Sequence, residues 1–276
     1  MKKMHHLKDC FWTPDDIVFM ANLGFTVKEK EYSHFYLEEN DLYKKLINRF
    51  SKRWDSLNDF VYFDYSKEDV FSADYCVIRP FGGGGYPQPE RTREWISNTF
   101  DMSEFCCYCG TPLVQVADFK VNRISKRPMW SFTAWIYDVY FATEDFYKEV
   151  FEPLGIGYRT VHRAAKRLYE GIVQIDIPVI DEELDLSMHT EKEVCPECGK
   201  VKYGAMVHYP FFPQPEHPLP HIFRTKEYFG YGAEAFHRTI ISTELAKELI
   251  KKKVINFDML TPCKKNLSEY LKTIKY

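Results

Sequence analysis

The chain lacks long apolar runs, a strong excess of charge of either sign, and an apolar segment at its beginning. No stretch of its 276 residues approaches the ~20 consecutive apolar residues that a membrane-spanning helix needs. The net charge of −3 provides no global basic field that would attract nucleic acid. The opening MKKMHHLKDC does not resemble a signal segment, which points to a reducing compartment. Together these absences predict a soluble protein with a cytoplasmic localisation.

Common catalytic motifs are also missing. The sequence contains no HExxH, no GxSxG and no GxGxxG after an expected strand. Gly82–Gly85 follow the expected strand Tyr75–Phe81, but the next residues are Tyr-Pro and not the Lys-Ser/Thr of a phosphate-binding loop. The other titratable candidates form no convincing catalytic set: Asp138, Glu144, His162, and the expected loop histidines His208, His217 and His221. We therefore expect that the chain is not an enzyme.

What the chain does have is a globular composition that is rich in aromatic residues. Hydrophobic residues make up 45% and charged residues 28%, a balance typical of globular proteins with a sizeable core. Aromatic residues reach 17%, with 22 Phe and 19 Tyr. This content predicts a thick aromatic core, or aromatic surface that is held for a partner.

The most informative feature is a pair of CxxCG knuckles that lie far apart in the sequence. They are Cys106-Cys107-Tyr108-Cys109-Gly110 and Cys195-Pro196-Glu197-Cys198-Gly199. Each knuckle offers two thiolates, and four thiolates complete a closed tetrahedral zinc site. We therefore predict one structural Zn²⁺ per chain, held by Cys106, Cys109, Cys195 and Cys198. The remaining cysteines Cys10, Cys76, Cys107 and Cys263 are expected to be ordinary residues or spectators.

A comparison of free energies favours the shared zinc site. Closing a loop of roughly 100 residues costs about 4.7 kcal/mol in the chain-entropy model, whereas a structural zinc site contributes about 10–16 kcal/mol in peptides at neutral pH. Disulfides, a dithiol redox pair, or iron in place of zinc remain alternative uses of the same cysteines. A catalytic metal is disfavoured because four thiolates leave no position for water.

The pattern of apolar residues predicts an α+β fold with a helical N-terminal segment. Residues 1–70 contain one helix that starts at the Thr13 cap and another from Asn40 to about Trp54. Residues 71–276 are expected to form a zinc-stapled α+β domain. Ile172–Ile180 is expected to be a strand, Leu113–Val121 alternates like one, and Asn266–Ile274 should form a last helix.

Two segments of this domain look like copies of one unit. Each has a strand, a Thr-Glu or Ser-Thr-Glu helix start, a short amphipathic helix and a closing strand. The first copy begins at Val139 and closes with Ile156–Val161, and the second begins at Thr239 and closes with Ile255–Leu260. We predict two β-rich pseudo-repeats with a seam near residues 165–170, joined by the shared zinc site. Chance convergence on a common β-α-β pattern is the alternative.

Charge is unevenly distributed between residues 159 and 193. Arg159, Arg163, Lys166 and Arg167 form a basic cluster around an expected helix. The following stretch holds seven acids against the single base Lys192: Asp176, Asp181, Glu182, Glu183, Asp185, Glu191 and Glu193. Both stretches are typical of solvated surface, but the acidic one could also contact a basic partner.

The two knuckles, together with the ending His221-Ile222-Phe223, Ile240–Glu244 and Ile255-Asn256-Phe257, resemble the double-CxxCG motif proteins of bacteria. The resemblance covers roughly residues 70–262. Some members of that family are described as immunity proteins that neutralise a toxin delivered between neighbouring cells.

The resemblance implies an immunity-type protein that binds a cognate toxin by occlusion, with zinc as scaffold. The lack of long apolar runs predicts that it has no membrane partner. The acids Asp181, Glu182, Glu183 and Asp185 are then candidate contacts for a basic toxin. The alternative is a zinc-ribbon nucleic-acid-binding or regulatory protein that uses Arg159, Arg163, Lys166, Arg167 and the C-terminal lysines Lys251–Lys253, Lys264 and Lys265.

Overall fold

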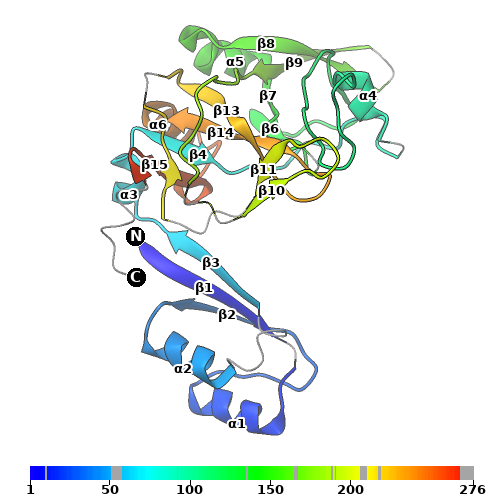
Figure 1. Ribbon diagram of the computed structural model, residues 1–276. Coiled ribbons are helices and arrows are strands. Elements are labelled where there is room, and N and C mark those ends of the chain that lie inside the picture. Colours follow the sequence, from blue (N-terminus) through cyan, green and yellow to red (C-terminus); the bar gives the residue numbers. More distant parts are fainter. Residues whose placement is uncertain are drawn as a thin grey trace. The chain divides into compact units, whose positions relative to one another are not determined.

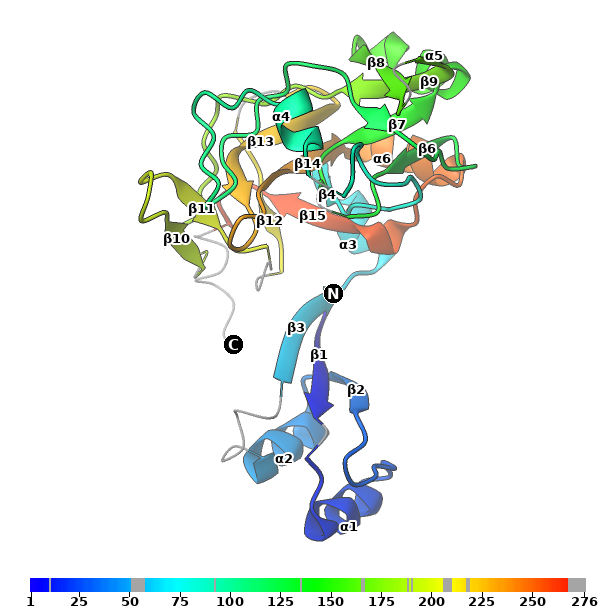
Figure 2. The ribbon, with the colours of Figure 1, turned by 90° about the vertical axis from the view of Figure 1, so that its right-hand side faces the viewer.

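The chain divides into two compact units in the computed structural model (Figures 1 and 2). One unit comprises Met1–Asp69 with Val207–Pro210, and the other comprises Val70–Met206 with Phe211–Tyr276. The structure describes residues 1–9, 11–50, 58–91, 93–134, 136–164, 167–187, 189, 191–205, 210–216 and 219–267.

The N-terminal unit is a three-stranded antiparallel sheet with two helices. Its elements are β1 (Lys2–Asp9), α1 (Pro14–Asn22), β2 (Ser33–Glu38), α2 (Asp41–Phe50) and β3 (Asn58–Asp64), with strand order β2-β1-β3. The Thr13 side chain caps α1, and Asp16 returns the bond in a capping box. The helices bury their apolar residues with one face of the sheet in a core that includes Leu7, Trp12, Met20, Phe35, Leu46 and Phe50.

This unit therefore contains both strands and helices, whereas the sequence pattern predicted a helical segment. Both expected helices are present. Helix α2 is described from Asp41 to Phe50, and residues 51–54 of the expected helix lie outside the described part of the chain. Strand β1 was missed because polar residues stand at inward positions. In β1 the buried residues His5, Leu7 and Asp9 alternate along the strand, and only one of them is apolar.

The C-terminal unit contains a seven-stranded and a five-stranded sheet. The seven-stranded sheet has the order β10-β11-β13-β14-β4-β15-β12, and the five-stranded sheet has the order β5-β8-β9-β7-β6. The strands are β4 (Tyr75–Ile78), β5 (Lys120–Val121), β6 (Met129–Ser131), β7 (Tyr140–Thr143), β8 (Gly157–Arg163), β9 (Leu168–Asp176), β10 (Lys192–Val194), β11 (Val201–Tyr203), β12 (Phe212–Pro213), β13 (Ile222–Phe229), β14 (Phe236–Ser242) and β15 (Leu260–Lys264). The helical elements are α3 (Lys67–Phe71, which crosses the division between the units), α4 (Trp95–Thr99), α5 (Glu144–Val150), α6 (Thr243–Lys251), and the 3-10 turns η2 (Glu152–Leu154) and η3 (Phe257–Met259). The fold is thus α+β, with more sheet than helix.

The expected aromatic core is present beside the five-stranded sheet. Phe119 is fully buried, and its ring meets those of Phe100, Phe132 and Phe141 edge-on. Trp95 of α4 joins the same core cluster. Edge-to-face packing of this kind adds about 0.5–1.5 kcal/mol per pair beyond the burial of area.

The two expected β-α-β segments have similar local structures. In the first, β7 and β8 flank the central strand β9, and α5 packs against β7 and β9. In the second, β14 and β15 flank β4, and α6 packs against β14 and β4. The caps also match, because Thr143 and Ser242 each accept a bond from the backbone three residues later. The central strand follows the first helix but precedes the second, so a duplication stays a prediction.

Several local expectations need correction. Residues around the basic cluster form β8 and a turn instead of a helix, because Gly157–Arg163 pairs along β9. The closing strand expected at Ile255–Leu260 begins only at Leu260, after η3. Of Leu113–Val121 only the last two residues form a strand.

Other boundaries also differ from the expected ones. The strand expected at 172–180 runs from Leu168 to Asp176 and ends before Pro178. Of the seam expected near residues 165–170, residues 168–170 belong to β9, whereas residues 165 and 166 lie outside the described part of the chain. The expected last helix lies mostly outside the described residues. None of the described helices is long and apolar enough to cross a membrane.

Candidate metal centre

The first knuckle lies at the tip of a loop between α4 and β5. We call the two sides of this loop, residues 100–105 and 111–116, its arms. The arms meet at the bridge between Phe100 and Gln115. Gln115 exchanges two amide hydrogen bonds with Gln174 of β9, at 2.9 and 2.7 Å. The Leu113 N–H donates to the Tyr228 hydroxyl of β13 at 3.1 Å. These bonds tie the first knuckle to both sheets of the C-terminal unit.

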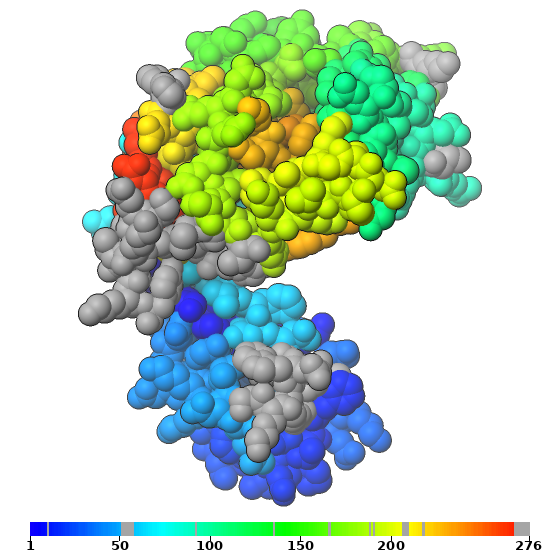
Figure 3. Space-filling model, in the orientation of Figure 1, coloured from blue at the N-terminus to red at the C-terminus, as the bar shows by residue number. Residues whose placement is uncertain are grey.

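The second knuckle is the turn of the β10–β11 hairpin. Val194 and Val201 are the last paired residues before the turn. β11 then pairs with β13 through Tyr203 and Phe229. Figure 3 shows the yellow-green surface of this hairpin beside the teal segment that carries the first knuckle. The seven-stranded sheet therefore carries the second knuckle at its edge.

The two knuckles have the same backbone geometry. Gly110 N–H donates to the Cys106 carbonyl at 2.8 Å, and Gly199 N–H donates to the Cys195 carbonyl at 2.9 Å. Both glycines have positive φ, at 77° and 71°. Because a side chain disfavours this conformation, the trailing glycine of each CxxCG is explained by the turn that it closes.

The knuckles bring all four predicted sulfurs together. Cys106 Sγ lies 3.8 Å from Cys195 Sγ, and Cys109 Sγ lies 3.6 Å from Cys198 Sγ. All four ligand atoms lie within 4.8 Å of one another. Four sulfurs bound at about 2.3 Å to one tetrahedral ion would be about 3.8 Å apart. The four cysteines therefore fit a single metal ion.

A disulfide does not explain these contacts. A disulfide joins sulfurs at about 2.05 Å, and none of the described cysteines is paired in this way. Cys109 and Cys195 are each 2% exposed, whereas Cys198 is open to solvent. Cys107 points outside the cluster and is exposed. The cluster thus draws its ligands from the first and fourth positions of each knuckle.

Without a metal ion, the surrounding protein groups do not favour ionisation of all four cysteines. Burial raises the pKa of Cys109, but hydrogen bonds with Thr111, Cys198 and Cys195 outweigh burial and lower it to about 7. A backbone bond from Lys200 lowers the pKa of Cys198, yet partial desolvation and bonds to the other three thiols raise it to about 12. Sulfurs this close compete for protons, so all four can be ionised only around a cation.

The structure adds two residues that the sequence analysis missed. Thr111 places its hydroxyl 3.1 Å from Cys109 Sγ, where it can donate to a thiolate. Lys202 of β11 is 2% exposed, and its ammonium donates to the carbonyls of Cys109, Gly232 and Glu234. Its charge partly compensates the excess negative charge of a four-thiolate centre. In the sequence, the only indication of the role of Lys202 is that a lysine stands at the second position of a strand that follows the second knuckle.

Cys76, Cys263 and the described titratable candidates do not belong to the cluster. Cys76 and Cys263 are buried, and burial raises the pKa of Cys76 to about 12. Asp138 is buried and accepts a bond from the His237 backbone at 3.0 Å. The other candidates have unrelated partners: Glu144 pairs with Lys148, His162 with Asp118, and His221 with Ser242. His208, His217 and Cys10 lie outside the described residues.

The acidic residues of segment 181–185 lie beside β13, and three of the four have a bond within the chain. Glu183 pairs with Lys226 at 2.9 Å. Glu182 accepts a bond from the Glu216 backbone, and Asp185 accepts from Ser187. Asp181 is exposed. These bonds orient the segment and neutralise part of its charge.

Comparison of the chain with protein-family models, with curated proteins and with solved structures finds no match. The function proposed below therefore rests on the geometry of the described residues and on the CxxCG resemblance.

The two knuckle glycines give a matched test of the site. Gly199→Ala should cost about 1–2 kcal/mol of unfolding free energy, because the left-handed backbone is its only constraint. Gly110→Ala should cost clearly more, because its Cβ would lie 2.3 Å from the Ala233 carbonyl oxygen. Urea unfolding of both variants measures the difference. Equal losses would contradict the close approach of the first knuckle to residue 233.

Two lysines that follow the second knuckle provide a second matched test of the site. Lys202→Met should destabilise the fold by about 1–3 kcal/mol, because it leaves carbonyls of Cys109, Gly232 and Glu234 without their donor. Lys200→Met, which removes a more exposed contact with Glu104, should change the unfolding free energy by no more than about 0.5 kcal/mol. Denaturant unfolding of the two variants provides the test. A Lys202→Met protein as stable as the Lys200→Met protein would argue against the bridging role.

Proposed function

We propose that the four cysteines hold one structural Zn²⁺. Zinc is supported by the all-thiolate ligand set and by sulfur separations that match a tetrahedral ion. All four tetrahedral positions are taken by protein, so the ion stabilises the fold and leaves no position for a substrate. Zinc binding to the unfolded chain would be far weaker, so the ion's binding free energy becomes folding free energy.

Cys195→Ser should lower the zinc content from about one ion per chain to well below one, because it removes a buried ligand. It should also reduce the yield of folded protein. Cys107→Ser is the matched control and should keep its zinc and its stability. Elemental analysis of the purified proteins, with circular dichroism, measures both effects. Full zinc content in the Cys195→Ser protein would refute the proposed ligand set.

We further propose that the chain is an immunity-type protein that binds and neutralises a cognate bacterial toxin by occlusion, without catalysing a reaction itself. The observation that carries a protein-binding function is the position of exposed apolar side chains. Most large ones in the described part of the C-terminal unit belong to the knuckles, to their arms or to the adjoining 230–235 turn. We call them the knuckle surface: Met102, Tyr108, Val114, Val116, Val194, Val201 and Tyr231.

Contacts between neighbouring segments support each half of this surface. Asp101 N–H donates to the Val114 carbonyl, so the residues next to Met102 pair with the other arm. Val194 and Val201 are direct neighbours across β10 and β11. Tyr231 donates from its hydroxyl to Glu191 beside the same hairpin. Exposed aromatic and aliphatic side chains on a rigid support are typical of protein-binding surfaces.

The acids Asp181, Glu182, Glu183 and Asp185 are a second candidate contact for a basic toxin. Their support is weaker, because Glu183 already pairs with Lys226 and Glu182 with the Glu216 backbone. Surface charges of this kind mainly change the association rate and its salt dependence.

A nucleic-acid-binding function has less support from the structure. Arg159 pairs with Asp176, and Arg163 lies over the Tyr169 ring. Near the C-terminus Lys252 pairs with Glu149 and Glu248. Basic residues that are engaged within the chain are less available to phosphates.

The proposed function predicts that a toxin gene lies next to the gene of this chain, and the product of that gene provides the test. Co-expression of the chain should restore growth of bacteria that produce the toxin domain. The double variant Val114→Asp/Val116→Asp should lose at least tenfold in affinity, because it places charges in the apolar contact. Leu168→Asp, on an exposed apolar residue of β9, should bind normally. Titration calorimetry gives the affinities.

Two outcomes would count against parts of this proposal. Growth inhibition that persists despite folded, abundant chain would count against immunity. Unchanged affinity after Asp181→Asn, Glu182→Gln, Glu183→Gln and Asp185→Asn would remove the acidic contact and leave the knuckle surface as the binding site.

A further inference from the structure

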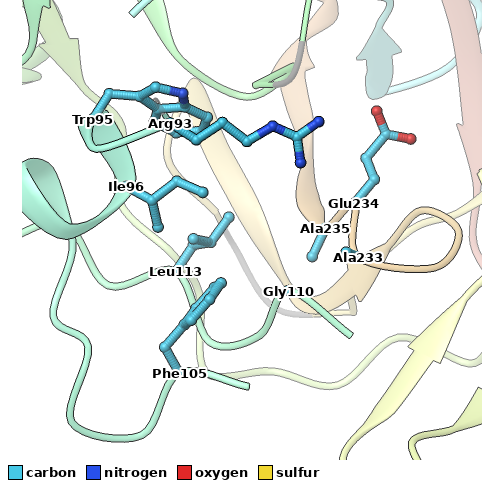
Figure 4. A pocket seen from close by; sticks show the side chains of 9 residues that line it. All are labelled: Arg93, Trp95, Ile96, Phe105, Gly110, Leu113, Ala233, Glu234 and Ala235. Atoms are coloured by element: carbon cyan, nitrogen blue, oxygen red, sulfur yellow. The ribbon is translucent and has the colours of Figure 1, made fainter. Parts of the chain in front are cut away.

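A pocket of about 240 Å³ opens beside the first knuckle (Figure 4). Its apolar wall is formed by Trp95, Ile96, Phe105 and Leu113. The opposite side is formed by the turn at residues 233–235, and Gly110 lies between the two. The pocket is smaller than the roughly 300–1,000 Å³ of small-molecule sites. Its size therefore suits a single amino-acid side chain.

Two charged side chains border this apolar space. Arg93 extends over the pocket toward the side on which the Glu234 carboxylate lies (Figure 4). A guanidinium offers two parallel N–H donors to a carboxylate. The Glu234 carboxylate on the opposite side can accept a hydrogen bond from a ligand N–H. Its negative charge repels a ligand carboxylate, which is therefore directed to Arg93. The pocket thus combines an apolar cavity, one anion-binding group and one hydrogen-bond acceptor.

The knuckles shape the pocket directly. The Ala233 carbonyl lies so close to Gly110 that a side chain there would not fit. The ammonium of Lys202, on the second knuckle's strand, holds the carbonyls of Gly232 and Glu234. The turn that carries Glu234 is therefore anchored to both knuckles. Exposed apolar residues Met102, Val114 and Tyr231 of the knuckle surface are sequence neighbours of the pocket residues.

We propose that this pocket binds the C-terminal residue of a partner polypeptide, with its apolar side chain against Trp95 and Leu113 and its α-carboxylate on Arg93. Within a polypeptide, only the C-terminal residue combines an apolar side chain with an α-carboxylate. Its own amide N–H can donate to Glu234. An internal apolar residue would fill the cavity but would bring no carboxylate to the guanidinium of Arg93. This inference rests on the proposed protein-binding function and names the part of the partner that enters the site.

The test uses the full-length, metal-loaded chain and fluorescein-labelled Gly-Ser peptides that end in leucine or phenylalanine. Fluorescence anisotropy should show at least tenfold tighter binding of the free carboxylate than of the matched C-terminal amide. Arg93→Gln should abolish this preference, and Leu113→Trp should block binding by filling the cavity. Arg91→Gln, which removes an exposed arginine two residues away, is the matched control and should retain the preference.

Three results would overturn the inference. They are equal binding of acid and amide peptides, an unchanged preference in the Arg93→Gln protein, and free leucine or phenylalanine that competes as well as the peptides. The last result would assign the pocket to a free amino acid. The toxin co-expression assay separates the two proposals, because protection that survives in Leu113→Trp leaves the immunity function intact without this pocket.

Discussion

The main constraint on the C-terminal unit is the close approach of four sulfur atoms that come from two distant parts of the chain. Each knuckle alone offers two ligands, which is too few to hold a structural ion. Bringing the knuckles together requires the folding of both sheets, because Gln115 is bonded to β9 and β11 is paired with β13. A metal bond set worth about 10–16 kcal/mol in peptides outweighs the closure of such a loop. The proposed zinc would thereby make the metal centre and the fold conditional on each other.

This dependence extends beyond the sulfurs. Lys202 connects the second knuckle to the first through the Cys109 carbonyl and to the 230–235 turn through Gly232 and Glu234. The same turn closes the pocket next to Gly110. A substitution at the metal centre should therefore also affect the knuckle surface and the pocket, without any large movement of the chain. Rigid support of this kind lowers the entropy that a binding surface loses when a partner docks.

Local sequence predicted the local structure well where one short motif carries all the information. The CxxCG spacing identified the four cysteines whose sulfurs lie together, and the caps at Thr13, Thr143 and Ser242 start helices as expected. Prediction was weaker where partners decide the outcome. Arg159–Arg163 is a strand because β9 lies beside it. The strand β1 was missed because its inward residues His5 and Asp9 are polar.

The sequence by itself determined the four cysteines, the knuckle glycines and an α+β class rich in aromatic residues, since each is written in neighbouring residues or in composition. Only the tertiary structure decided which groups surround the sulfurs. Thr111, Lys202 and the pocket formed by Arg93, Leu113 and Glu234 depend on contacts between segments that are separated by many residues. Such contacts follow from the packing of whole sheets, and no local pattern in the chain encodes them.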